Sequence, residues 1–183
     1  SLSELINSRT VLPCFNCTDP TIAISQGKDL GRFKLYLADT GLFVTLMLKT
    51  GKETASSLYS KMLSDKLPAN LGYLYENSVA QIMTSCGLEL YYMTWQKPNS
   101  THAYEVDFIF SKGAKTVPVE VKSSGLGKHE SIDAFTTKYS SIVTAPCMIS
   151  QKDIGKEQQL SLFPFYLAPF IFEKRTEGQT STR

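Results

Sequence analysis

Long hydrophobic runs are missing from this sequence. The longest apolar stretch, residues 41–48, is interrupted by Thr45 and is far shorter than the roughly 20 residues that a membrane-spanning helix needs. The first residues contain no basic segment followed by an apolar one, as a secretory signal would. Both absences favour a cytoplasmic protein without a membrane span.

A large net charge is missing too. The 19 Lys and Arg residues are nearly balanced by 17 Asp and Glu residues, which leaves a formal charge of +2. Nucleic-acid binding therefore cannot be inferred from bulk charge and would need a local basic patch. With 183 residues, 42% of them hydrophobic and 20% charged, the chain has the composition of a globular protein with one main core.

Potential zinc ligands are few, with 2 histidines and 4 cysteines in the chain. Cys14 and Cys17 have the two-residue spacing of a zinc knuckle, but no second close pair follows. His102 and His129 lie far away in the sequence. Unpaired cytosolic thiols are therefore a better interpretation than a structural zinc site.

Hydrophobic spacing predicts a mixed α/β fold. Residues 33–48 favour an extended segment that enters a helix capped by Asp39 or Thr40. A second helix is predicted between Asn70, as its amino-terminal cap, and Gly87, as its terminator. A third helix is predicted around Ile132, Phe135 and Tyr139, and the segments expected to form strands are 88–95, 105–111, 116–122, 142–149 and 160–167.

Domain organisation follows from the same pattern. Residues 1–30 are interpreted as an amino-terminal remnant or connector, because a short helical pattern leads into a polar segment that contains proline. Residues 31–172 form the expected main domain. Residues 173–183 are polar and are expected to be a mobile tail.

Two of the expected strands carry the residues of chemical interest. Strand alternation places Val106 and Phe108 on one face and Asp107 on the other. In the next strand, Glu120 and Lys122 share the face opposite three valines. The carboxylates of Asp107 and Glu120 can therefore approach each other without exposing the apolar side chains.

A tight turn at residues 113–114 would set the register of these two strands. It places Asp107 opposite Glu120 and Glu105 opposite Lys122. Directly opposed side chains have Cβ atoms about 4.5–5.5 Å apart, so the two carboxylates would repel each other. The alternative is a solvent-facing hairpin, in which Glu105 pairs with Lys122 while both carboxylates of the Asp107–Glu120 pair point into water.

A divalent cation would relieve that repulsion. Mg²⁺ and Mn²⁺ prefer oxygen ligands and could orient a water molecule and a scissile phosphate between Asp107 and Glu120. Lys122 could then stabilise the charge that develops on the phosphate. Glu76, on the flank of the predicted helix, could reach the same end of the sheet, although alone it would be interpreted as a solvated helix glutamate.

These residues together resemble a known arrangement. Glu76 on a helix, Asp107 in Glu-Val-Asp-Phe, and Glu120-Val121-Lys122 are similar to the helix acid, strand acid and Glu-x-Lys element of the PD-(D/E)XK nuclease superfamily. The resemblance implies a restriction-endonuclease-like core with a mixed central sheet flanked by helices. It further implies that Asp107 and Glu120 are metal ligands, that Lys122 is the catalytic lysine and that Glu76 is an auxiliary acid.

A second resemblance concerns the domain context. Residues 33–42, 72–77, 105–108 and 118–123 are similar to the carboxy-terminal domain of unknown function of prokaryotic AAA-type P-loop ATPases. That likeness implies an ATPase module upstream. The chain has no Walker-type glycine-rich Lys-Ser/Thr motif, so no ATP site is expected here. The expected function is a metal-dependent DNA endonuclease or phosphodiesterase, and the alternative is a noncatalytic nucleic-acid-binding or protein-interaction effector domain of that ATPase.

Basic and aromatic residues near the expected site suggest a surface for DNA. Tyr91, Tyr92 and Trp95 could offer stacking faces, and the lysines that could contact nucleic acid are Lys112, Lys115, Lys128 and Lys138. The alternative is that the lysines only solubilise the protein and that the aromatic side chains belong to the core. The sequence does not discriminate DNA from RNA and leaves the oligomeric state open.

Overall fold

The computed structural model describes residues 1–49, 54–57, 60, 69–123 and 129–173. Lys128 and residues 174–183 of the expected tail lie outside these ranges. None of the helices within the described ranges combines the length and the apolar character that crossing a bilayer requires.

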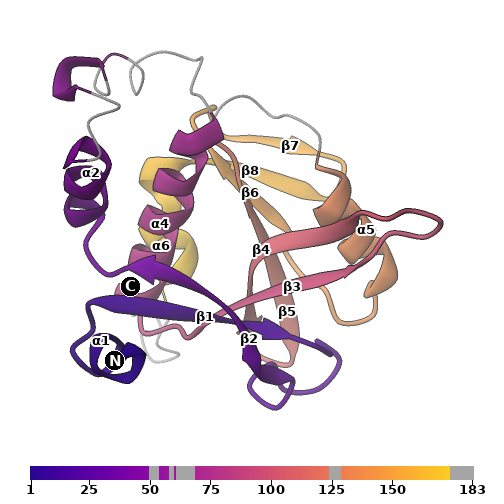
Figure 1. Cartoon of the computed structure of the whole chain (residues 1–183). Coiled ribbons are helices and arrows are strands. Elements are labelled where there is room, and N and C mark those ends of the chain that lie inside the picture. Colours follow the sequence, from indigo (N-terminus) through magenta and orange to yellow (C-terminus); the bar gives the residue numbers. More distant parts are fainter. Residues whose placement is uncertain (50–53, 58–59, 61–68, 124–128, 174–183) are drawn as a thin grey trace, which may run out of the picture.

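Among the described residues, eight strands form one mixed sheet in the order β2-β1-β3-β4-β5-β6-β8-β7 (Figure 1). The strands are β1 (Val11–Cys17), β2 (Lys28–Leu37), β3 (Leu90–Gln96), β4 (Ala103–Lys112), β5 (Lys115–Val121), β6 (Cys147–Ser150), β7 (Gly155–Glu157) and β8 (Leu160–Pro164). β1 pairs with β3, β5 with β6, and β6 with β8 in parallel, whereas the other neighbours are antiparallel. The expected α/β class with a mixed, helix-flanked sheet is confirmed.

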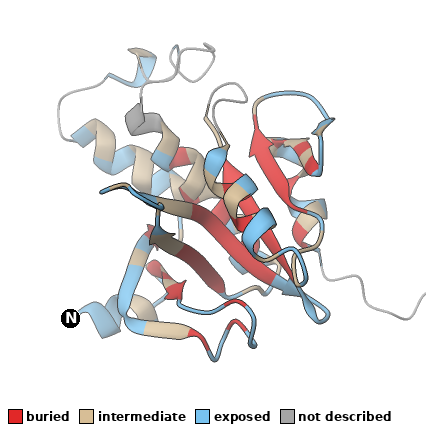
Figure 2. Ribbon diagram, turned by 90° about the vertical axis from the view of Figure 1, so that its right-hand side faces the viewer, coloured by how far each residue is buried: buried red, intermediate tan, exposed pale blue. Residues whose placement is uncertain are grey.

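Helices cover both faces of this sheet. α4 (Ala69–Ser85) and α6 (Ala168–Phe172) lie on one face, and α5 (Glu130–Lys138) lies on the other (Figure 1). α1 (Leu2–Asn7) precedes β1, α2 (Thr40–Lys49) packs beside α4, and a 3₁₀ turn, η1 (Phe165–Leu167), leads into α6. The inner strands are the most buried part of the molecule (Figure 2).

Apolar side chains on the two faces form separate clusters. Phe108 and Val119 pack with Met83 of α4, whereas Ile109 packs with Phe135 of α5. All five side chains are fully shielded from water. Because burying one such side chain contributes about 1.5–3 kcal/mol, the two clusters hold the helices against the sheet.

Local signals place the helix ends. The Oδ1 atom of Asp39 accepts hydrogen bonds from the backbone N–H groups of Gly41 at 2.7 Å and Leu42 at 3.3 Å, so Asp39 caps α2 as expected. Gly87 has a φ of 76°, the left-handed conformation that terminates α4, and this expectation is also confirmed. Ala69 is already helical, so α4 begins before Asn70, the expected cap.

The segment expected to be a connector contains an inner strand. β1 lies between β2 and β3, so residues 11–17 belong to the central sheet. Cys14 packs in the cluster beneath α4 and Cys17 in the cluster beneath α5, and both are free thiols. Since the two thiols lie on opposite faces of the sheet, they cannot bind one zinc ion.

The last strands are shorter than their apolar segments. Residues 142–149 were expected to be extended, but β6 begins only at Cys147, after Ala145 with its positive φ of 45°. Residues 160–167 were expected to form one strand, but β8 ends at Pro164 and the chain enters η1. Proline lacks the N–H group that would continue the ladder, which explains the second difference.

Candidate metal centre

The β4–β5 hairpin has the register that the sequence predicts, and it opens at the expected carboxylates. Gly113, with a φ of 62°, lies in the turn, and residue pairs join the strands as far as Phe108 and Val119. One step further, the backbone N–H of Val121 donates to the Oδ2 atom of Asp107 at 2.8 Å. The carboxylate of Asp107 thus takes the place of a backbone carbonyl as the acceptor for the N–H of Val121.

β4 carries a bulge at this position. Between Val106 and Ile109 it has one more residue than β3 opposite. Val106 and Ile109 consequently pack in the same cluster, beneath α5, whereas Phe108 packs in the cluster beneath α4. The expectation that Val106 shares a face with Phe108 is wrong, because a bulge interrupts strict alternation. Asp107 lies within the bulge, a feature that commonly re-aims a side chain beside an active site.

Both carboxylates of the pair are buried. Asp107 is 9% exposed and Glu120 is 5% exposed, so the alternative in which they point into water is wrong. Oε1 of Glu120 accepts a hydrogen bond from Nζ of Lys122 at 2.7 Å. Oε2 of Glu120 is buried and has no hydrogen-bond partner within the described part of the chain. Such an unsatisfied group costs about 1–3 kcal/mol, and more when it is charged.

Glu105 does not pair with Lys122, contrary to the solvent-facing alternative. Its Oε1 atom lies 2.6 Å from Nζ of Lys34, on β2, while Lys122 pairs with Glu120. The sequence did not predict that Lys34 and Tyr36 lie near the acidic residues. Alternation along residues 33–37 places them on one face, but nothing local indicates that β2 lies near β4.

Burial dominates the proton affinities of the carboxylates. It raises the pKa of Asp107 well above its usual value, and the negative charges of Glu120 and Glu76 raise it further. Burial also raises the pKa of Glu120, although the ammonium of Lys122 opposes this. The pKa of Lys122 lies above its usual value, since attraction to Glu120 and Asp107 outweighs the effect of its burial.

Glu76 lies within electrostatic range of Asp107 and Glu120. Burial raises its pKa, and its Oε2 atom accepts a hydrogen bond from the hydroxyl of Tyr36 at 3.2 Å. Its neighbour Asn77 joins α4 to β2: Oδ1 accepts from the N–H of Leu37 at 2.7 Å, and Nδ2 donates to the carbonyl of Leu37 at 3.0 Å. These bonds fix the helix that carries Glu76.

The lysines expected to contact nucleic acid are not gathered at the carboxylates. Lys112 and Lys115 lie at the turn of the hairpin, about 16 Å from Asp107 at ~3.3 Å per residue along β4. Lys115 donates to the carbonyl of Ser141 at 2.5 Å. Lys138 lies over the ring of Trp95, 5.8 Å from its centroid.

The expected stacking residues differ in exposure. Tyr91 and Tyr92 are buried in the two clusters, so they cannot stack on nucleic-acid bases. Trp95 is half-buried and packs against Phe135 and Tyr104. For the two tyrosines, the alternative that they belong to the core is therefore the correct one.

The donor set is that of a hard, oxygen-preferring ion. The described residues contain no group of three or more His, Cys, Asp or Glu side chains that could hold a metal. Mg²⁺ commonly binds through one or two carboxylates and completes its shell with water and substrate oxygens, which suits Asp107 and Glu120. Oε2 of Glu120, which has no hydrogen-bond partner among the described residues, is available as a ligand atom, so the residues fit Mg²⁺ or Mn²⁺.

Comparison with known proteins identifies a family to which part of the chain is similar. A family described as "Domain of unknown function (DUF4143)" matches residues 71–164, from α4 to the end of β8. The matched segment includes Glu76, Asp107, Glu120 and Lys122. No curated protein and no solved structure matches the chain. Because the match covers slightly more than half of the sequence, the chain belongs to the DUF4143 family.

Proposed function

We propose that this domain is a metal-dependent phosphodiesterase that cleaves DNA as an endonuclease and has a PD-(D/E)XK-like core. The observation that carries the proposal is the buried pair of Asp107 and Glu120, which leaves Oε2 of Glu120 without a partner among the described residues. A structural ion pair would satisfy its own acceptors. A divalent cation bound by this oxygen would satisfy it, and carboxylate oxygens are the ligands that such ions prefer.

The acidic side chains and Lys122 would have different roles in cleavage. Asp107 and Glu120 would hold the ion, which when bound supplies Lewis-acid polarisation and lowers the pKa of water. Lys122, which stays protonated because its pKa is raised by its acidic neighbours despite burial, would face the charge that develops on the phosphate. Glu76, hydrogen-bonded to Tyr36, would act as an auxiliary acid in the hydrogen-bond network around the attacking water.

A DNA digestion assay tests the proposal. The purified chain would be incubated with plasmid, linear and single-stranded DNA in Mg²⁺ and in Mn²⁺. We expect cleavage that Asp107→Asn and Glu120→Gln each reduce at least a hundredfold, while Glu4→Gln, a change of an exposed carboxylate on α1, leaves it unchanged. The absence of cleavage under every condition, with an upstream ATPase module restored as well, would contradict the proposal.

We infer a second candidate, a noncatalytic effector domain attached to an ATPase, from the surface of α2. This helix has no fully buried residue although it is strongly apolar, and Leu42 and Leu46 are 37% and 46% exposed. Exposed apolar residues that gather on one helix commonly mark a contact surface for another protein. Two results together would favour this second function. The chain would cleave no DNA, and it would bind the ATPase module with an affinity that Leu46→Glu lowers.

A further inference from the structure

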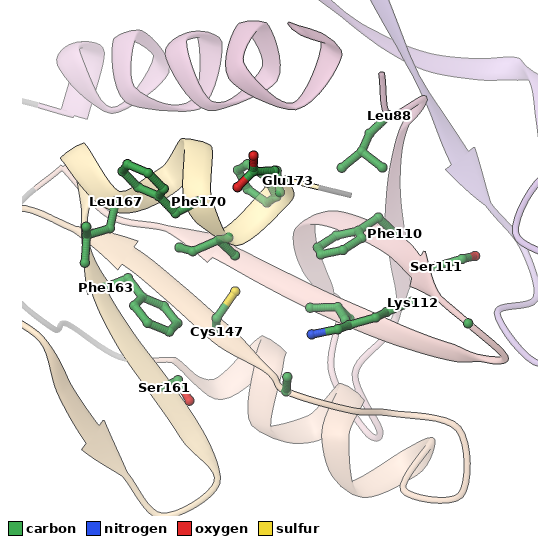
Figure 3. Close-up of a pocket in the computed structure, with 15 residues that line it drawn as sticks. Leu88, Phe110, Ser111, Lys112, Cys147, Ser161, Phe163, Leu167, Phe170 and Glu173 are labelled. Carbon is green, nitrogen blue, oxygen red and sulfur yellow. The ribbon is translucent and has the colours of Figure 1, made fainter. Parts of the chain in front are cut away.

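A large cavity lies away from the carboxylate centre. It has a volume of about 950 Å³ and is bounded by the β4–β5 hairpin, β6, β8 and α6 (Figure 3). Apolar side chains supply most of its wall: Leu88, Phe110, Phe163, Leu167, Phe170 and Phe172. Ligand pockets commonly measure about 300–1,000 Å³ and are mostly apolar with a few polar groups, and this cavity matches that description.

Aromatic rings give the cavity a stable wall and an open mouth. Phe110 of β4 and Phe172 of α6 meet edge to face, with ring centroids 5.7 Å apart. Phe172 is fully buried, whereas Phe170 is 72% exposed. An apolar ligand would therefore find a fixed inner surface and a partly exposed ring at the rim, and covering that ring would add to its affinity.

One cation faces this apolar space. Lys112 lies at the end of β4, and its amine is directed toward Cys147 (Figure 3). Burial raises the pKa of Cys147 to about 12, and the positive charge of Lys112 opposes that rise. Among the described residues, no carboxylate lies within ion-pair distance of Nζ of Lys112.

The charges at the cavity limit the ligand further. Besides Lys112, the lining contains one ionisable carboxylate, that of Glu173. Lys112 can neutralise one anionic group, and the carboxylate of Glu173 would repel further negative charges such as those of a nucleotide or a polyphosphate. Lys112 is an exposed residue that lines the cavity, so a small molecule that enters the cavity can reach its amine.

We propose that this cavity binds a small amphipathic carboxylate, with its hydrocarbon body against the phenylalanine wall and its carboxylate at Lys112. The site is separate from the metal centre: Lys112 and Asp107 stand about 16 Å apart along β4, at ~3.3 Å per residue. The inference is therefore independent of nuclease activity. Charge assistance makes such a carboxylate–ammonium contact stronger than a neutral hydrogen bond.

Calorimetry with three ligands that share one tail tests this proposal: octanoate, octylamine and 1-octanol, each below its aggregation concentration. We expect octanoate to bind to the whole chain at least tenfold more tightly than the other two. Lys112→Met should remove that preference. Lys115→Met is the matched control, because Lys115 pairs with Lys112 across the hairpin but does not line the cavity, and it should change the affinity less than twofold.

A second variant tests the cavity itself. Ser161→Trp places a large ring in the space from a half-exposed position on β8 and should abolish octanoate binding while circular dichroism stays unchanged. Equal binding of octanoate and octylamine, or full affinity in either Lys112→Met or Ser161→Trp, would overturn the proposal. The proposal would also be overturned if the chain does not bind octanoate and sediments as a dimer. A second copy of the chain would then be the occupant of the cavity.

Discussion

Asp107 shows at the scale of one residue how a buried carboxyl weakens a fold. Its pKa is raised by burial and by Glu120 and Glu76, so the folded state binds its proton more tightly than the unfolded state does. The free energy of unfolding must then fall as pH rises from the ordinary aspartate pKa through the raised one. Without metal, the Asp107 carboxyl therefore stabilises the fold less above the ordinary aspartate pKa than it does below it.

Asp107→Asn should therefore stabilise the metal-free protein. Asparagine keeps an acceptor for the N–H of Val121 but carries no charge, so we expect the midpoint of thermal unfolding at pH 7 in EDTA to rise by several degrees. Added Mg²⁺ should raise the midpoint of the native chain and not that of the variant. Asp133→Asn on α5 is the control, and a lower midpoint for Asp107→Asn in EDTA would show that its charge is satisfied within the fold.

Lys122 offers a second prediction at this scale. If its ammonium acts on the phosphate, Lys122→Ala should lower metal-dependent turnover about 10²–10³-fold, the range seen when one transition-state donor is lost. Metal affinity should change less, because the carboxylates hold the ion. Calorimetry with Mn²⁺ and the digestion assay would be run side by side with Lys115→Ala as control. Unchanged turnover would remove Lys122 from the mechanism.

At the scale of elements, helix α4 depends on Asn77, a buried side chain that bonds both the N–H and the carbonyl of Leu37. Asn77→Ala leaves two backbone groups of β2 unsatisfied and should lower the free energy of unfolding by about 2–4 kcal/mol. Gln81→Ala removes the acceptor of an exposed hydrogen bond from the hydroxyl of Thr40 and should lower the free energy of unfolding far less. Urea unfolding of both variants measures this, and equal losses would refute a special role for Asn77.

Several local elements were predictable from sequence, whereas β1, within the expected connector, and the long-range contacts were not. Alternation and a tight turn gave the β4–β5 register, because a hairpin is set by neighbours in the chain. The bulge at Asp107 escaped prediction because it depends on how β3 pairs with β4. The ion pair of Lys34 with Glu105 escaped for a similar reason, since it depends on the place of β2 in the sheet.

The whole molecule places its two candidate sites at opposite ends of one hairpin. β1 inserts between β2 and β3, which brings the cation of Lys34 to the carboxylate end. Lys112 and Lys115 lie at the turn of the hairpin, and Lys112 lines the apolar cavity. DNA held only at the metal centre would therefore leave the turn uncovered.

Salt dependence of DNA binding tests this geometry. With Ca²⁺ in place of Mg²⁺ to prevent cleavage, duplex affinity measured by fluorescence anisotropy should fall as salt rises, because binding releases counterions from the phosphates. The slope should be shallow, because it follows the number of phosphates that cations contact, and the lysines that the ion pairs place at the carboxylates are Lys34 and Lys122. The double variant Lys112→Ala, Lys115→Ala should keep that slope, because both residues lie about 16 Å from Asp107 at ~3.3 Å per residue. A slope reduced by about two, roughly one for each lysine, would instead extend the DNA interface along the whole hairpin, and no binding at low salt would contradict the nuclease proposal.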